Sequence, residues 1–87
     1  MRFAIHYQEE VVCNDIPRLS KTSKERIKSA IEEKLTTSPE QFGKPLRRSL
    51  KGYRRLRVGD YRIIFRIEET TVKIFAVQHR SRVYEKY

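Results

Sequence analysis

Arginine side chains in the second half of the chain are the residues best suited to chemistry. Residues 1–43 carry seven Lys/Arg and seven Asp/Glu, whereas residues 44–87 carry thirteen Lys/Arg and four Asp/Glu, so the net charge of +9 lies in the second half. A planar guanidinium can hold a phosphate through two hydrogen bonds at once. An Arg-rich surface on a small protein therefore favours a polyanion, with nucleic acid as the first candidate. The arginines of this half are Arg47, Arg48, Arg54, Arg55, Arg57, Arg62, Arg66, Arg80 and Arg82.

The length and composition predict a single domain over residues 1–87. Hydrophobic residues make up 38% of the chain, which is enough for a two-layer fold with a modest core. The single Cys13 can form no internal disulfide, and Arg2 and Glu9 interrupt the opening segment as a secretory signal. No apolar run approaches the roughly 20 residues that span a bilayer. We therefore expect a cytoplasmic protein with no membrane partner.

The first half of the sequence predicts a strand followed by two helices. Apolar residues alternate over residues 2–7, as in a strand, and their spacing changes over residues 8–19 to that of a short helix. Thr22 and Glu25 have the spacing of a capping box at the start of a second helix that ends near Leu35. The residues expected to face the sheet from the two helices are Val12, Ile16, Leu19, Ile27, Ala30, Ile31 and Leu35.

The second half predicts an antiparallel meander. Residues 54–58 and 61–67 flank Gly59-Asp60, a two-residue hairpin signal, and residues 72–79 form a last strand. Residues 36–45 are expected to be a connection. The predicted fold is α+β: a two-layer sandwich in which an α-helical hairpin covers one face of a small, mainly antiparallel, four-stranded sheet, in the order β-α-α-β-β-β.

The register of the predicted hairpin places two arginines opposite each other. If Gly59-Asp60 is the turn, Arg57 faces Arg62, and like charges directly opposed across strands destabilise a sheet unless an anion joins them. This opposition points to a binding surface. We expect Leu56, Val58, Tyr61, Ile63 and Phe65 to lie under the helices, and Arg55, Arg57, Arg62, Ile64 and Arg66 to lie on the opposite face with Phe75, Val77 and His79 of the last strand.

Four segments of the chain resemble the RelE/ParE superfamily of bacterial and archaeal toxins. They are Gly43-Lys44-Pro45-Leu46, Leu50-Lys51-Gly52-Tyr53, Arg57-Val58-Gly59-Asp60-Tyr61-Arg62-Ile63-Ile64-Phe65 and His79-Arg80-Ser81-Arg82-Val83-Tyr84. The resemblance implies a RelE-like fold and a toxin encoded beside an antitoxin. In the RelE branch it implies a ribosome-dependent endoribonuclease, or mRNA interferase, that cleaves messenger RNA in the decoding site without a metal and so inhibits translation.

By this resemblance, the catalytic positions are Arg55, Arg62, Arg80 and Tyr84. The arginines would stabilise the extra charge of the phosphate in the transition state. Tyr84 is a candidate base, because neighbouring guanidiniums favour its phenolate, and His79 is the alternative base. The sequence does not decide between them. Further RNA-binding positions are Lys51, Arg54, Arg57, Arg47, Arg48 and Arg82. An isolated surface arginine is, however, more often only a solvated charge. Arg57 could instead serve the fold or an antitoxin interface.

The expected partners are the ribosome, messenger RNA and a cognate RelB-like antitoxin in a toxin–antitoxin hetero-oligomer. No metal site is expected, because Cys13, His6 and His79 have no close ligand spacing, and no cofactor is expected either. Two alternatives stay open. One is a non-catalytic ParE-type inhibitor of DNA gyrase, and the other is an RNA-binding module of the same fold without activity.

Overall fold

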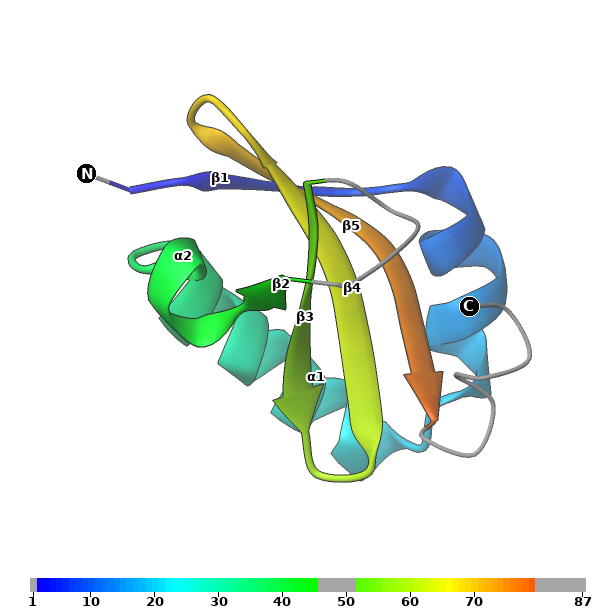
Figure 1. Ribbon diagram of the computed structural model, residues 1–87. Helices are drawn as coiled ribbons and strands as arrows, with labels where there is room; N and C mark the ends of the chain where they lie inside the picture. The colour runs from blue at the N-terminus through cyan, green and yellow to red at the C-terminus, as the bar shows by residue number, and fades with distance from the viewer. Residues whose placement is uncertain (1, 46–51, 80–87) are drawn as a thin grey trace.

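The protein folds into two layers, with the helices packed against one face of a twisted sheet (Figure 1). The computed structural model describes residues 2–45 and 52–79. The prediction of an α+β sandwich with strands after a helical segment is confirmed. No helix in this described part of the chain is long and apolar enough to cross a membrane.

The sheet is mixed, and its strands follow the order β1-β5-β4-β3-β2. The first strand runs parallel to β5, and the remaining neighbours are antiparallel. The four longer strands match the four that the sequence predicts. A two-residue edge strand, β2, is an addition that lies in the expected connection. The strands are β1 (Ala4–Tyr7), β2 (Lys44–Pro45), β3 (Tyr53–Val58), β4 (Tyr61–Glu68) and β5 (Thr71–His79).

The first helical segment is less regular than its sequence pattern indicates. It consists of a π-helical turn, Val11–Asp15, followed by a 3-10 turn, Ile16–Arg18. The expectation that Val12 faces the sheet is wrong: Val12 is 51% exposed, and Val11 is fully buried instead. A π-helical turn brings residues five apart onto one face, so Val11 and Ile16 both pack toward the core.

The N-cap of the second helix lies two residues earlier than predicted. Helix α1 (Lys21–Ala30) continues directly into a π-helical turn, Ile31–Leu35. Its N-cap is Ser20, which has extended backbone geometry and accepts a hydrogen bond of 3.1 Å from the Ser23 backbone N–H. The predicted capping box at Thr22 is therefore wrong, because Thr22 already lies inside the helix.

A short helix, α2 (Pro39–Phe42), occupies the segment that the sequence predicts to be a simple connection. Proline at its first turn needs no N–H partner and already has a helical φ. After α2 the chain passes directly over the core. A Cβ atom added to Gly43 would lie 2.1 Å from Cζ of Phe65, so only glycine fits at this crossing.

Residues from the helical segment and the sheet meet in one hydrophobic core. Ile27, Ile31 and Leu35 form the buried stripe of the second helical segment, as their spacing predicts. The sheet contributes alternate residues of β3, β4 and β5. The buried cluster comprises Val11, Leu19, Ile27, Ile31, Leu35, Leu56, Ile63, Phe65, Val72, Ile74 and Val77, with Val58 and Tyr61 packed against it.

A β-bulge at Phe75 changes the side on which the last part of β5 presents its residues. Phe65 pairs with Ile74, but Ile64 pairs with Ala76, so Phe75 is an extra residue in β5. An extra residue reverses the alternation of side chains beyond it. The prediction that Val77 and His79 lie on the arginine side is therefore wrong: Val77 is in the core, and His79 pairs with Tyr61.

On the edge of β5 away from β4, the part beyond the bulge is held by a side chain rather than by a neighbouring strand. The pairing of β1 with β5 ends at Ile74, and Asp15 then accepts a hydrogen bond of 2.9 Å from the Val77 backbone N–H. This N–H lies in a partly buried region, where an unsatisfied donor destabilises the fold. The first helical segment thus fixes the far half of β5.

We expect Asp15→Ala to lower the free energy of unfolding by about 1–3 kcal/mol, because the Val77 N–H loses its acceptor. Asp15→Asn keeps a carbonyl acceptor and should lose less. Urea unfolding measures both, with Glu10→Ala, an exposed residue of the same segment, as the matched control. Equal unfolding free energies for Asp15→Ala and Glu10→Ala would contradict this role.

Candidate functional site: an arginine-rich sheet face

The sheet face turned away from the helices carries most of the described arginines of the second half. We call it the arginine face and define it by Arg55 and Arg57 on β3, Arg62 and Arg66 on β4, and Gln78 on β5. The observed register of the hairpin confirms the predicted pairs Arg57–Arg62, Arg55–Ile64 and Leu56–Ile63. Because Leu56, Ile63 and Phe65 are buried in the core, the alternating arginines point to the other side.

The row nearest the hairpin turn contains Arg57, Arg62 and Gln78. Arg57 pairs with Arg62, and Arg62 pairs with Gln78, so the three residues cross β3, β4 and β5 side by side. Cα atoms of directly paired residues in antiparallel strands lie about 4.5–5.5 Å apart. Arg57 is exposed and Arg62 is half-buried. Like charges on directly paired residues repel each other and favour an anion between them.

In the row farthest from the turn, two cations share one acidic partner of the protein. Glu68 forms ion pairs with Arg66 at 3.5 Å and with Lys73 at 3.1 Å. The Arg66 guanidinium also lies 5.8 Å from the centre of the Tyr53 ring, which in turn packs edge-on against Phe75 at 4.9 Å. These contacts hold Arg66 within the protein, so it is a poor ligand for an external phosphate.

Arg55 and Arg57 differ from Arg66 in this respect. Neither forms an ion pair with another residue of the described ranges 2–45 and 52–79. Among the described residues, Glu68 therefore pairs with Arg66, whereas Arg55 and Arg57 have no acidic partner. An anionic ligand should bind near the turn.

A small polar cavity lies at this end of the hairpin. It has a volume of about 100 Å³ and is lined by Arg57, Arg62, Tyr61 and the turn residues Gly59 and Asp60. A water molecule occupies roughly 30 Å³, so the cavity has room for a group of only a few heavy atoms. The cavity suits a single phosphate better than a base or a whole nucleotide.

Gln78 is a residue of this site that the sequence patterns did not single out. It is 8% exposed, and its Oε1 atom has no hydrogen-bond partner in the described part of the chain. The bulge at Phe75 places it opposite Arg62. A signal was present in the sequence, because Gln78 is the one polar residue between Ile74 and His79 in an otherwise apolar run.

The structure separates two of the predicted site residues from the arginine face. Arg54 pairs with Phe65, and its Nη1 donates a hydrogen bond of 3.0 Å to the Gly43 carbonyl, so it holds the chain at the edge of the core. His79 lies on the helix side, with its ring edge-on to Tyr61 at 5.3 Å. Six further predicted residues lie outside the described residues: Arg47, Arg48, Lys51, Arg80, Arg82 and Tyr84.

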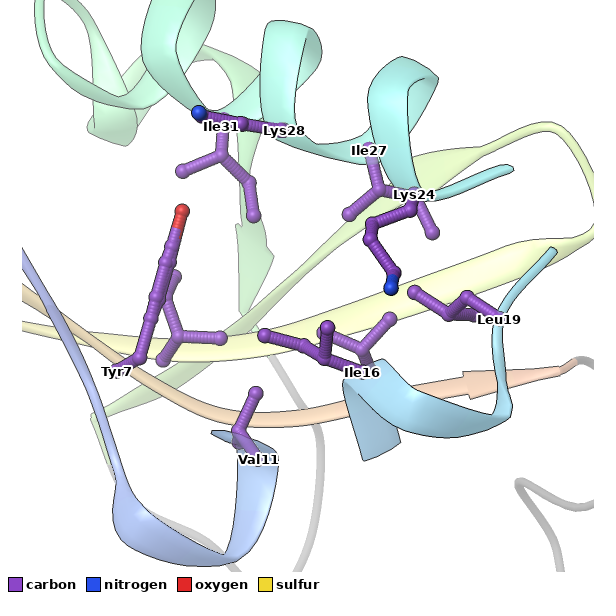
Figure 2. Close-up of a pocket in the computed structure, with 10 residues that line it drawn as sticks. Tyr7, Val11, Ile16, Leu19, Lys24, Ile27, Lys28 and Ile31 are labelled. Carbon is purple, nitrogen blue, oxygen red and sulfur yellow. The ribbon is translucent and has the colours of Figure 1, made fainter. Parts of the chain in front are cut away.

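The helix side of the sheet offers a different environment. Figure 2 shows a cavity of about 260 Å³ between the sheet, the first helical segment and α1, in which the Tyr7 hydroxyl points toward α1. Burial, and next the negative charge of Glu32, raise the pKa of Tyr7, so its phenol stays neutral. Three of the lining residues are polar: Tyr7, Lys24 and Lys28. The others are apolar: Val11, Ile16, Leu19, Ile27, Ile31, Ile74 and Val77. A mainly apolar lining disfavours a charged phosphate, because burying the anion there would remove its water.

No group of three or more His, Cys, Asp or Glu side chains that could hold a metal ion occurs in residues 2–45 and 52–79. The titratable groups near the turn are Arg57, Arg62, Asp60 and Tyr61. The described arginines of this face have the chemistry to bind a phosphate and to stabilise added negative charge on it.

Comparison with known proteins gives a consistent result. A family model for the ParE toxin of the type II toxin–antitoxin system parDE matches residues 11–84. The toxin RelG of Mycobacterium tuberculosis is 43% identical over 67 residues, which cover 70% of this chain and 77% of that protein.

Solved structures of toxin–antitoxin complexes share the fold. A chain of the complex RelBE2 from Mycobacterium tuberculosis is similar with a TM-score of 0.82 and 30% identity, covering 92% of this chain and 100% of that chain. A chain of the RelB–RelE antitoxin–toxin complex from Methanococcus jannaschii is similar with a TM-score of 0.76 and 25% identity, covering 94% of this chain and 98% of that chain.

The repulsion between Arg57 and Arg62 has a measurable consequence. We expect Arg57→Thr to raise the free energy of unfolding at low ionic strength by about 0.2–1 kcal/mol, because it removes a like charge opposite Arg62. The gain should shrink at high salt, which screens exposed charges. Urea unfolding at two ionic strengths tests this.

The matched control is Arg66→Thr on the same face. It removes the ion pair with Glu68 and the contact with Tyr53, so it should destabilise the protein rather than stabilise it. If Arg57→Thr destabilises the protein as Arg66→Thr does, then Arg57 supports the fold and the two opposed charges do not repel significantly.

Proposed function

Because the chain belongs to the RelE/ParE superfamily of toxins from type II toxin–antitoxin systems, we propose that it is a ribosome-dependent endoribonuclease that cleaves messenger RNA in the decoding site. The observation that carries the proposal is the opposition of Arg57 and Arg62 on the sheet face away from the helices, at the end where no described acidic residue pairs with Arg55 or Arg57. Such a surface suits the phosphodiester backbone of RNA. A ribosomal target also means that the protein acts in the cytoplasm.

The proposed reaction uses the 2′-hydroxyl of the RNA as the nucleophile. The oxygen of this hydroxyl attacks the adjacent phosphorus as its proton leaves to a base. The bond to the 5′-oxygen of the next nucleotide breaks, and that oxygen takes a proton from an acid. The products are a 2′,3′-cyclic phosphate and a free 5′-hydroxyl. The reaction moves the phosphoryl group from the 5′-oxygen to the 2′-oxygen, with one proton taken by the base and one given by the acid, and it is proposed to need no metal or cofactor.

The arginine face would stabilise the phosphate during this transfer. The attacked phosphate gains negative charge as the new bond forms, and preorganised cations at that position lower the barrier. Arg62 at the centre of the face and Arg55 one row farther from the turn are the described candidates, with Arg80 as a third. Arg57 faces Arg62 and would hold the substrate phosphate, as would Lys51 and the flanking arginines Arg47, Arg48 and Arg82.

The base is proposed to be Tyr84, with His79 as the alternative. Guanidinium groups near a tyrosine favour its phenolate, which can accept the proton of the 2′-hydroxyl. The bulge at Phe75 weakens the case for His79, because it directs His79 to the side of the sheet that carries Tyr61.

A neutralising partner follows from the charge of the free toxin. An acidic, partly disordered segment of a RelB-like antitoxin would cover the arginine face and fold as it binds. The similar chains from Mycobacterium tuberculosis and Methanococcus jannaschii were both solved in toxin–antitoxin complexes. Binding of this kind would block access of RNA to Arg57 and Arg62.

A second candidate is a ParE-type toxin that binds DNA gyrase without catalysis. The matching family model bears the description of ParE toxins, which favours this alternative. Supercoiling assays with the purified protein separate the two functions. Gyrase inhibition with intact messenger RNA on ribosomes would select the ParE-type function and reject the nuclease.

We expect Arg62→Ala and Arg55→Ala each to reduce messenger cleavage on programmed ribosomes by about 10²–10³-fold, because each removes a donor to the charged phosphate. Primer extension should show new messenger ends inside codons with the wild type and few with these variants. Arg26→Ala, an exposed arginine on α1, is the control and should cleave as the wild type does. Wild-type cleavage by Arg62→Ala would rule out the arginine face as the site.

The identity of the base leads to a further prediction. Tyr84→Phe should lower the cleavage rate by about 10²–10⁴-fold, whereas His79→Ala should retain most of the activity. Single-turnover rates on programmed ribosomes as a function of pH measure both variants. The reverse order of effects would assign the base to His79.

A further inference from the structure

Gln78 is a buried polar residue whose position the fold alone does not explain. Its side chain is 8% exposed, and its Oε1 accepts no hydrogen bond in the described part of the chain. A buried acceptor without a donor destabilises a protein, and an apolar residue of similar shape would avoid the loss. Buried polar groups of this kind are found at functional sites more often than elsewhere.

The bulge gives Gln78 its place on the arginine face. Without the extra residue Phe75, continuation of the Phe65–Ile74 register would bring Val77 opposite Arg62. With the bulge, Gln78 stands opposite Arg62, and Asp15 fixes this half of β5 through the Val77 N–H. The protein thus presents a carboxamide to the central arginine of the face.

We propose that Gln78 is a positioning residue that holds the Arg62 guanidinium in place when a phosphate binds between Arg57 and Arg62. This inference rests on the proposed function. A guanidinium has five N–H donors, and a phosphate takes two of them through one edge. A half-buried Arg62 needs acceptors for the donors that the phosphate leaves, and Oε1 of the adjacent Gln78 supplies one.

The arrangement also accounts for the choice of residue. A carboxylate at this position would form an ion pair with Arg62 and compete with the phosphate for it. An apolar residue would offer the Arg62 guanidinium no acceptor from this position of β5. A neutral carboxamide orients the guanidinium and leaves its charge available to the substrate.

The test compares Gln78→Met with the wild type in the full chain. Methionine has a similar length and volume but no hydrogen-bond acceptor of comparable strength. We expect cleavage on programmed ribosomes to fall about tenfold, as for the loss of one hydrogen bond to a charged group. The thermal midpoint should stay at the wild-type value or rise, because the buried unsatisfied acceptor is gone. A purely structural role of Gln78 would lower both together.

A double-mutant cycle with Arg62→Lys shows whether Gln78 acts through Arg62. Lysine keeps the charge but lacks the planar fork, so Gln78→Met should cause no further loss in the Arg62→Lys background. Gln41→Met, at an exposed glutamine of α2, is the matched control and should leave cleavage unchanged. If Gln78→Met fails to fold, Gln78→Ala takes its place in the same cycle.

A second measurement does not depend on RNA cleavage. The guanidinium protons of Arg62, followed by NMR in the presence of inorganic phosphate, should exchange with solvent faster in Gln78→Met than in the wild type. Unchanged exchange and wild-type cleavage would overturn the role of Gln78, as would a tenfold loss that persists with Arg62→Lys. If the wild type itself cuts no messenger, the proposed function fails and the proton exchange alone decides the role of Gln78.

Discussion

Two arginines facing each other on neighbouring strands are the interaction on which the proposed chemistry depends. Arg57 and Arg62 are paired by the hairpin register, and no rearrangement of loops can separate their backbones without breaking β3 from β4. Leu56 and Ile63 form the next cross-strand pair and hold the register from the core side of the sheet. The core therefore keeps the two like charges on directly paired positions, which is the arrangement on which the proposed phosphate binding depends.

The two ends of the arginine face differ in whether their cations form ion pairs within the described part of the protein. Toward the end with Glu68, the cations Arg66 and Lys73 are paired and serve the fold. Toward the turn, Arg57 has no described acidic partner and stays available. The apolar cavity on the helix side, with Tyr7 and two lysines among its lining, has a different chemistry and lies across the sheet from these charges (Figure 2). One sheet thus carries a core on one side and an arginine-rich surface on the other.

The sequence predicted the hairpin better than it predicted the ends and irregularities of the elements. Gly59-Asp60 defines a two-residue turn, and period-two alternation then determines which arginines share a face. The bulge at Phe75 was not predictable in this way, because Phe75, Ala76 and Val77 are all apolar and either face of the strand accepts them. The position of His79 was wrong for that reason, and Gln78 was overlooked. At the start of α1, Ser20 and Thr22 are both residue types that suit an N-cap. The backbone is extended at Leu19 and Ser20 after the 3-10 turn, so the helix begins directly after Ser20.

The most direct measurement is an electron cryomicroscopy structure of the protein on a ribosome programmed with a messenger that carries 2′-O-methyl groups and so resists cleavage. The expected result is a messenger phosphate held between Arg57 and Arg62, with the helices turned away from the RNA. A messenger bound against α1 on the helix side, or a protein bound to the ribosome with the arginine face directed to solvent, would contradict the role assigned to these two arginines.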